Sequence, residues 1–143
     1  MKLSTRARYG VRLMLVLAKN YGKEPIYLKD IAGEEDISEK YLSLIIMPLR
    51  GIGLVNSVRG AYGGYNLARD PSEITLKEIV DVLEGGCSLV DCVKDPSVCP
   101  RVPICVSHDI WAIIGGKISE TLSSITLDKM VRMNRKKTRK RKK

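Results

Sequence analysis

All four cysteines and the only histidine of this chain lie within one short stretch, at Cys87, Cys92, Cys99, Cys105 and His108. Cys105 and His108 are three positions apart at the expected start of a helix, so both side chains can face one point. Cys92 and Cys99 come from the segment before that helix. Thiolate and imidazole groups favour zinc, copper or iron–sulfur centres over magnesium or calcium. The sequence therefore predicts a metal centre with Cys92, Cys99, Cys105 and His108 as ligands.

The spacing of these ligands bears on the kind of centre. Zinc sites usually contain Cys-x2-4-Cys pairs, whereas the intervals here contain six, five and two residues. An iron–sulfur cluster is larger and can take ligands from an open loop, so the spacing favours a cluster. A zinc site and a thiol-based redox function without metal both stay open. Cys87 is left over as an alternative ligand, a reactive thiol or a small apolar residue that closes the preceding helix.

The charges of the chain form a second pattern. Nine of the 25 basic residues lie in residues 132–143, which contain no acid, so the formal net charge of +9 belongs to this tail. The other residues hold 16 basic and 16 acidic groups. Residues 1–23 and 40–69 nevertheless contain basic residues and no acids. This segregation predicts one basic face on a neutral body, as expected of a surface that binds phosphate groups.

Capping residues and apolar spacing predict the elements that carry these groups. A helix is expected from Ser4 to about Asn20, a shorter one over residues 28–35, and a third over residues 38–50. Only a brief turn separates the second helix from the third. Two helices joined in this way form a helix-turn-helix, so the sequence predicts a recognition helix over residues 38–50.

A hairpin is expected directly after these helices. Residues 54–58 have strand character, residues 59–64 form a glycine-rich tip, and residues 65–67 return as a second strand. A helix-turn-helix followed at once by a hairpin is the order of elements in a winged helix. The predicted fold is therefore mainly α-helical with a small β-hairpin wing.

The winged helix places the candidate DNA contacts. Ser38, Lys40 and Ser43 point away from the apolar side of the recognition helix and could reach base edges in the major groove. Arg59 at the wing tip suits a narrow minor groove, where the negative potential attracts a guanidinium. Basic and aromatic residues of the first helix would hold phosphates. The predicted DNA-binding residues are Arg6, Arg8, Tyr9, Ser38, Lys40, Ser43, Arg59, Gly60 and Tyr62.

The second half of the chain begins with a clear helix signal. Thr75 and Glu78 predict a capping box for a helix that ends near Gly85. Residues 85–102 show no periodic pattern, and a loop of this length in a small protein is usually functional. The helix expected over residues 103–124 carries an apolar stripe without an evident partner. The stripe consists of Val106, Ile110, Ile113, Ile114, Ile118 and Leu122.

These motifs resemble the Rrf2 family of bacterial winged-helix transcriptional regulators, and within it most closely the iron–sulfur cluster regulator branch, IscR. The matching stretches are residues 1–5, Arg8-Tyr9-Gly10, 37–42, 53–55, the wing at 57–65, the cysteine loop and 125–127. The resemblance covers residues 1–131. It implies that Cys92, Cys99 and Cys105 bind a cluster and that His108 completes a 2Fe-2S site. The first interval is one residue longer than in that branch, which leaves room for a 4Fe-4S centre.

The resemblance also implies a homodimer joined through the long helix, which would cover the apolar stripe. Two recognition helices about one DNA turn apart imply a pseudo-palindromic operator on double-stranded DNA. His108 argues against the nitric-oxide-sensing branch of the family. A branch that regulates cysteine metabolism has a similar wing and lacks the loop cysteines, so this chain differs from it at the cysteine loop.

The expected organisation has four parts. Residues 1–84 form a DNA-binding domain and residues 85–102 a cysteine-rich, cluster-binding loop. Residues 103–131 form the dimerisation helix and a short packing helix, and residues 132–143 a disordered basic tail. No targeting segment or membrane span is apparent, so the expected compartment is the cytoplasm and no membrane partner is expected.

The function predicted from the sequence is that of a DNA-binding transcriptional regulator, expected to be a repressor. An iron–sulfur cluster would control promoter binding by sensing cluster status, redox state or nitric oxide. One alternative is an iron–sulfur or metal carrier, or a redox protein, that uses the winged helix for protein contacts. A zinc- or thiol-based regulator is another. No catalytic triad, phosphate loop or pair of carboxylates indicates an enzyme.

Overall fold

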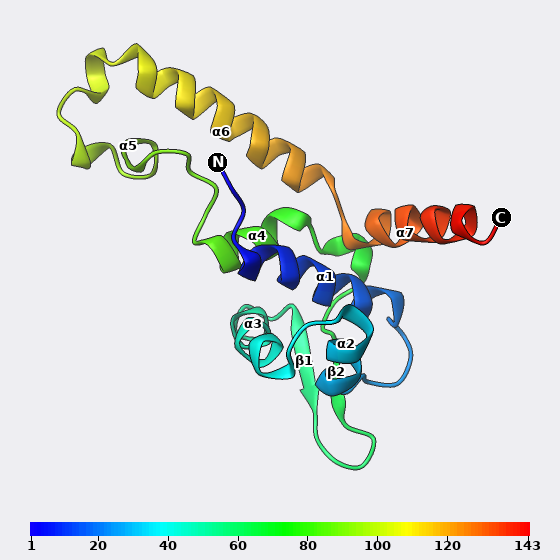
Figure 1. Cartoon of the computed structure of the whole chain (residues 1–143). Coiled ribbons are helices and arrows are strands. Elements are labelled where there is room, and N and C mark those ends of the chain that lie inside the picture. Colours follow the sequence, from blue (N-terminus) through cyan, green and yellow to red (C-terminus); the bar gives the residue numbers. More distant parts are fainter.

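The computed structural model describes residues 1–143, and the chain is mainly helical with one antiparallel hairpin, as predicted (Figure 1). Three helices, the hairpin and a fourth helix form the first half. The second half is a short helix followed by two long ones. In chain order the elements are α1 (Thr5–Lys19), α2 (Leu28–Glu35), α3 (Glu39–Gly51), β1 (Val55–Val58), β2 (Gly64–Leu67), α4 (Leu76–Glu84), α5 (Asp91–Lys94), α6 (Val106–Ser124) and α7 (Leu127–Arg141).

Three of the predicted helix caps are present. The Ser4 hydroxyl accepts a hydrogen bond from the backbone N–H of Ala7, and the Ser38 hydroxyl accepts one from Tyr41. Thr75 and Glu78 form the expected capping box. Each such cap is worth about 1 kcal/mol. The starts of α1, α3 and α4 are therefore fixed by residues next to them in the sequence.

The core of the first half lies where α1 crosses α3 and α4. Leu13 of α1, Leu42 of α3 and Ile79 of α4 are fully buried there. Gly10 lets the helices approach closely, because a Cβ atom at this position would overlap Leu83 Cδ1 and lie 3.3 Å from Ile45 Cγ2. The position of the recognition helix is thus set by tight packing behind it.

The hairpin is joined to the chain segment before α2. Val55 pairs with Leu67 and Val58 with Gly64, while Ile26 exchanges two backbone hydrogen bonds with Tyr65, of 2.9 and 2.8 Å. Gly64 has a φ of +131°, and a Cβ atom there would lie 2.5 Å from the Ile26 carbonyl oxygen. Only glycine suits this conformation and this contact. The base of the wing is therefore held against the start of α2.

The expected irregular loop over residues 85–102 is partly regular in the structure. It contains α5 and a 3₁₀ turn at Pro96–Val98, and a further turn, Val102–Ile104, precedes α6. Asp95 accepts hydrogen bonds from the N–H and hydroxyl of Ser97, which stabilises the second of these three elements. Such single turns are too short to produce a periodic apolar pattern, so the prediction missed them.

Helix α6 starts later than expected and is only loosely attached to the rest of the chain. It begins at Val106 because Cys105 serves as its N-cap. Gly115 is its only buried residue, and the helix projects from the winged helix together with α5 (Figure 1). The structure contains no helix with the length and apolar character needed to cross a lipid bilayer.

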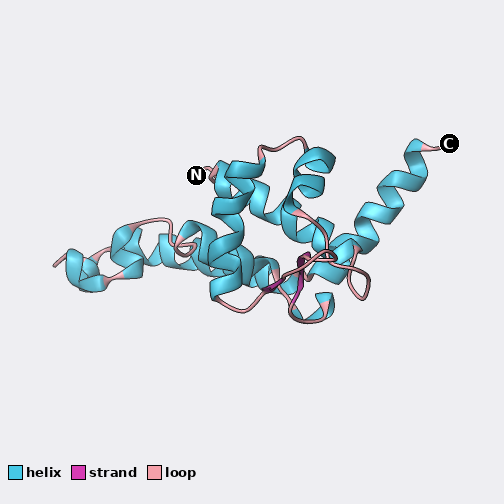
Figure 2. Ribbon diagram, turned by 90° about the horizontal axis from the view of Figure 1, so that it is seen from below, coloured by secondary structure: helices cyan, strands magenta, loops and turns pink.

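The prediction of a disordered tail is wrong in this structure, because α7 continues through the basic segment to Arg141. Thr126 caps the helix, and Leu127 and Val131 are buried in the core. No glycine or proline follows, and lysine and arginine are good helix formers. The basic end of α7 extends away from the remaining elements (Figure 2).

Candidate functional site

Three residues at the start of the recognition helix α3 were predicted to contact bases. Only one of them, Lys40, has a side chain without a hydrogen-bond or ion-pair partner in the chain. Lys40 is exposed and forms no ion pair. The hydroxyl of Ser38 accepts from the Tyr41 N–H at 3.1 Å, and the hydroxyl of Ser43 donates to the Lys40 carbonyl at 2.6 Å. A hydroxyl can both donate and accept, so Ser38 retains a donor and Ser43 an acceptor for a ligand.

The wing tip presents the next predicted residues. Arg59, Gly60 and Tyr62 are all exposed, and Arg59 forms no ion pair. Tyr27, just before α2, donates from its hydroxyl to the Ala61 carbonyl oxygen at 2.5 Å. This bond connects the tip to the helix-turn-helix, so the Arg59 guanidinium projects from an anchored loop.

The predicted phosphate contacts on α1 differ from one another. Arg6 and Arg8 are exposed, whereas Tyr9 is half-buried and packs edge-to-face on Tyr41 of α3, with ring centroids 5.8 Å apart. The guanidinium of Arg8 lies 5.9 Å from the Tyr9 ring centroid. Tyr9 therefore joins α1 to the recognition helix: its spacing with Leu13 and Leu17 placed it on the apolar face of the first helix, but the sequence did not indicate Tyr41 as its partner.

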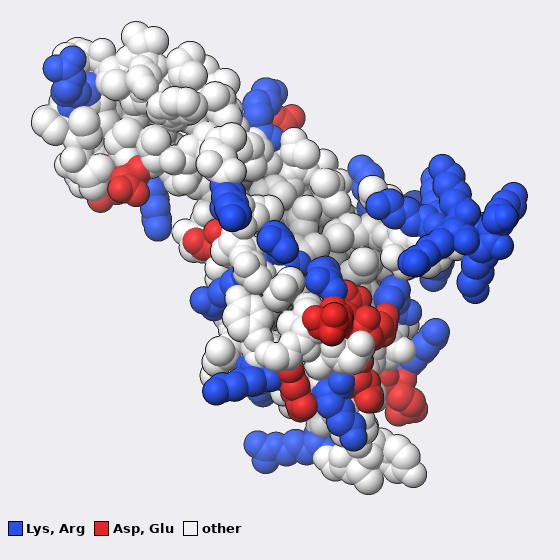
Figure 3. Space-filling model, in the orientation of Figure 1, with Lys and Arg blue, Asp and Glu red and all other residues white.

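Not every basic residue of the acid-free segments is free to bind phosphate. Arg12 and Lys19 of α1 form ion pairs of 2.7 and 2.6 Å with Glu35 and Glu34 of α2. The face seen in Figure 3 accordingly carries both signs over the winged helix, while the charged side chains gathered at the end of α7 are all basic. Within the acid-free segments, the unpaired cations near the DNA-reading elements are Arg6, Arg8, Lys40, Arg50 and Arg59.

Two of the four predicted metal ligands place their donor atoms in contact, and a third contacts the backbone of one of them. Cys92 of α5 has its Sγ 3.4 Å from Nδ1 of His108 in the first turn of α6. The Cys105 thiol accepts a hydrogen bond from the His108 N–H, also at 3.4 Å. All three residues are half-buried. Helices α5 and α6 thus bring together two donor atoms from positions 16 residues apart.

The fourth ligand does not join this group. Cys99 follows the Pro96–Val98 turn, and no three Cys, His, Asp or Glu side chains of the chain lie close enough together to hold a metal ion. All four cysteines are free thiols. The donor types and the Cys92–His108 contact fit an iron–sulfur centre, while completing the set requires the thiols of both Cys99 and Cys105 to approach that pair.

Cys87 lies in the segment between α4 and α5 and contacts other residues than these ligands: its thiol lies beside Asp81 of α4. Its own burial, together with the Asp81 carboxylate, raises the pKa of the thiol above the ordinary value of 9.0. Its carbonyl oxygen faces α6 at Gly115. A raised pKa means less thiolate at neutral pH, which argues against the reactive-thiol interpretation of Cys87.

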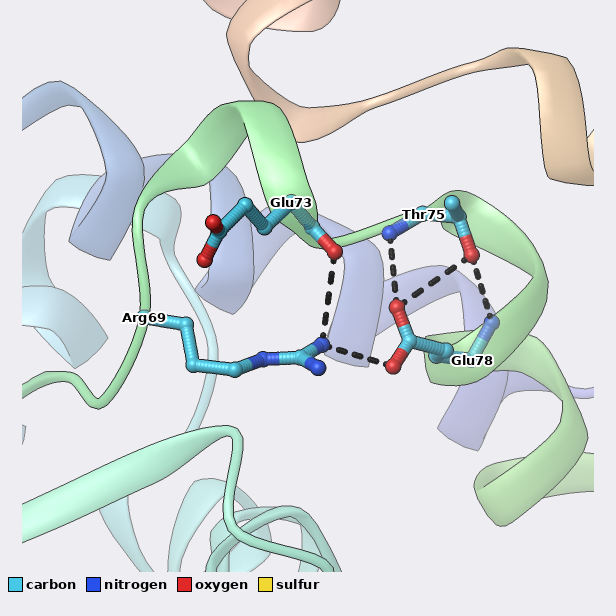
Figure 4. Close-up of polar contacts among 4 residues, drawn as sticks. All are labelled: Arg69, Glu73, Thr75 and Glu78. Atoms are coloured by element: carbon cyan, nitrogen blue, oxygen red, sulfur yellow. Dashed lines mark hydrogen bonds and ion pairs between the residues drawn. The ribbon is translucent and has the colours of Figure 1, made fainter.

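An ion pair that the sequence did not reveal connects the wing to α4. Arg69, just after β2, donates to the Glu73 carbonyl at 3.4 Å and to the Glu78 carboxylate at 2.6 Å (Figure 4). Glu78 also accepts from the Thr75 N–H at 2.9 Å. The Thr75-x-x-Glu78 motif predicted the cap, but nothing in the sequence indicated that Arg69 would share the same carboxylate.

A helix-turn-helix whose exposed helix and adjacent hairpin carry unpaired cations defines a winged-helix DNA-binding protein. The Rrf2 family profile, described as "Iron-dependent Transcriptional regulator", matches residues 3–133. The chain therefore belongs to the Rrf2 family. This is a family of transcriptional regulators, so the expectation that the protein is not an enzyme is confirmed.

Two of the similar curated proteins are regulators named CymR and IscR. The chain is 43% identical to the regulator CymR of Bacillus subtilis, over 90% of this chain and 88% of CymR. It is 35% identical to IscR of Photorhabdus laumondii, over 92% of this chain and 79% of that protein.

The solved structures give a similar result. B. subtilis CymR, the "Global Cysteine Regulator", matches with a TM-score of 0.79 and 40% identity over 93% of this chain and 98% of that one. T. potens IscR matches with a TM-score of 0.78 and 41% identity over 94% and 88%. The two solved structures thus match this chain about equally well. Of the two curated relatives, CymR has the higher identity, so the prediction that the chain is most similar to IscR is not supported.

Proposed function

We propose that this regulator binds its operator under the control of an iron–sulfur cluster held by Cys92, Cys99, Cys105 and His108. The observation that carries the proposal is the 3.4 Å contact between Cys92 Sγ and His108 Nδ1, which joins the cysteine segment to the start of α6. The resemblance of this ligand set to the IscR branch favours a 2Fe-2S cluster, with a 4Fe-4S cluster as the alternative. When bound, the cluster supplies a charged centre that oxidation or loss can remove.

The chain offers a continuous route from these ligands to the wing. The end of α6 is joined to the start of α4, because Leu76 N–H donates to the Ile125 carbonyl at 2.7 Å and Leu127 N–H donates to the Ile74 carbonyl at 2.9 Å. Glu78 in the first turn of α4 then holds Arg69 at the end of the wing (Figure 4). A movement of α6 would therefore be transmitted to α4 through these two backbone hydrogen bonds, and from α4 to the hairpin through the Arg69–Glu78 ion pair.

The partner of the apolar face of α6 is, in this proposal, a second copy of the chain. Val106, Ile110 and Ile113 are 72%, 47% and 60% exposed, and Trp111 beside them is 39% exposed. Leaving such a stripe in water is costly, at about 25 cal/mol per Å² of apolar surface. A symmetric dimer through α6 would cover it and present two recognition helices to a pseudo-palindromic operator.

Anaerobic isolation followed by iron and sulfide analysis tests the presence of the cluster. We expect a brown protein with visible absorption bands and bound iron and sulfide. Cys92→Ala, Cys105→Ala and His108→Ala should each lower the iron content, while the matched variant Cys87→Ala should keep it. A colourless protein with bound zinc would support a zinc-based regulator, and a metal-free protein would overturn the proposal.

A further inference from the structure

The outer face of the recognition helix carries two apolar side chains that the core does not use. Leu44 and Met47 of α3 are 58% and 63% exposed. The buried residues of the same helix, Leu42, Ile45, Ile46 and Leu49, lie on the other side. Single exposed apolar residues are common on protein surfaces. Two neighbouring ones on the helix that faces DNA in this fold class require a separate explanation.

These two residues lie in line with unpaired cations. Lys40, Leu44 and Met47 follow one another at intervals of four and three residues, which places them along one face of a helix. Arg50 continues the row, three residues beyond Met47. Neither Lys40 nor Arg50 forms an ion pair. An apolar pair between two free cations is complementary to a polyanion that also presents apolar groups.

Met47 also borders the space between the helix and the wing. It lines a hollow there together with Arg50 of α3 and Asn56 and Val58 of β1. Val58 is itself 38% exposed. Through Met47 the apolar surface of α3 thus reaches the inner side of the wing, where a duplex bound by both elements would lie.

The only apolar group that B-DNA presents in its major groove is the C5-methyl group of thymine. We infer that Leu44 and Met47 read thymine methyl groups in each operator half-site. Three helical residues span about 4.5 Å along the helix axis, and base pairs repeat about every 3.4 Å. The two side chains would therefore contact neighbouring base pairs. The inference rests on the proposed docking of α3 in the major groove and does not depend on the cluster.

Replacement of thymine by deoxyuridine tests this inference, because uracil keeps the base pairing and lacks only the methyl group. An operator is first selected from a random duplex library with the full-length protein, and each thymine is then replaced in turn. We expect a loss of affinity of about fourfold at each contacted thymine, the equivalent of one buried methyl group. Leu44→Ala and Met47→Ala should each abolish the penalty at one position.

Met133→Ala is the matched control, because Met133 is a similarly exposed methionine on α7. It should retain the full uracil penalty. Thermal unfolding of each variant checks that the fold is unchanged, as expected for exposed residues. The inference is overturned if no sequence is selected, if no thymine shows a penalty, or if the penalty persists in both α3 variants. Each affinity is measured with cluster-loaded and cluster-free protein, so a failure of the cluster proposal would be seen separately.

Discussion

Glu78 is a residue at which charge, capping and contact with the wing coincide. Burial acts to raise its pKa, but hydrogen bonds from the Thr75 N–H and the Arg69 guanidinium outweigh burial and bring the pKa below its ordinary value of 4.5. A carboxylate with a lowered pKa stabilises the folded state above the pKa of the unfolded chain. This contribution is lost as the pH falls through the lower, folded pKa.

Glu78→Gln separates the charge from the cap, because glutamine can still accept from Thr75. We expect the free energy of unfolding at pH 7 to fall by about 0.5 kcal/mol, since the ion pair with Arg69 is partly exposed to solvent. Glu78→Ala should cost about 1 kcal/mol or more, because the cap is lost as well. Urea unfolding at neutral and acidic pH measures both effects. A difference between wild type and Glu78→Gln that persisted at acidic pH would contradict this assignment.

The hairpin depends on a glycine that no other residue can replace. Gly64→Ala would force a side chain into positive φ and against the Ile26 carbonyl. We expect a loss of about 2 kcal/mol or more in unfolding free energy, together with weaker DNA binding. Gly51→Ala is the control, since Gly51 ends α3 with open space around it and should gain up to about 1 kcal/mol. Equal stability of Gly64→Ala and wild type would contradict the described wing.

Helix α7 makes a separate prediction, because its basic end extends away from the rest of the chain (Figure 2). Deleting residues 132–143 should reduce the slope of log affinity against log salt by about 0.9 for each phosphate that the segment neutralises. The choice of operator sequence should not change. Circular dichroism should show less helix after the deletion, and an unchanged spectrum would mean that the segment is unfolded in solution. Loss of sequence preference would mean that the tail reads DNA bases.

Local signals made the first half of the chain predictable. Ser4, Ser38 and Thr75 cap their helices through neighbouring residues, and the hairpin tip is encoded by its glycines. The Arg69–Glu78 and Tyr9–Tyr41 contacts join residues from different elements, so no local pattern could indicate them. The helical state of the basic segment was missed because its charge density is also typical of disordered tails.

The candidate site was predictable in its residue types but not in its arrangement. The spacing of the cysteines and His108 indicated a ligand set, and the contact of Cys92 with His108 agrees with it. The position of Cys99 depends on turns stabilised by single side chains such as Asp95. These turns leave no periodic trace in the sequence, so the arrangement of the loop could not be predicted.

The proposed dimer depends on the apolar face of α6. Ile113→Asp places a charge in the middle of the exposed stripe and should convert a dimer to a monomer in analytical ultracentrifugation. Operator affinity should fall with it, because the two half-sites would no longer be bound by one particle. Tyr21→Asp, an exposed residue of the winged helix, should leave the dimer intact. A wild-type protein that is monomeric at micromolar concentration would contradict the dimer.

The most direct measurement for the central claim is operator affinity with and without the cluster. Wild-type protein and the triple variant Cys92→Ala, Cys99→Ala, Cys105→Ala are compared before and after anaerobic iron–sulfur reconstitution, with Cys87→Ala as the control. The account predicts that reconstitution changes wild-type and control affinity by about tenfold or more, a coupling of about 1.4 kcal/mol. The triple variant should show no change. Equal wild-type affinity in both states would contradict the account and leave a promoter-binding protein without cluster control.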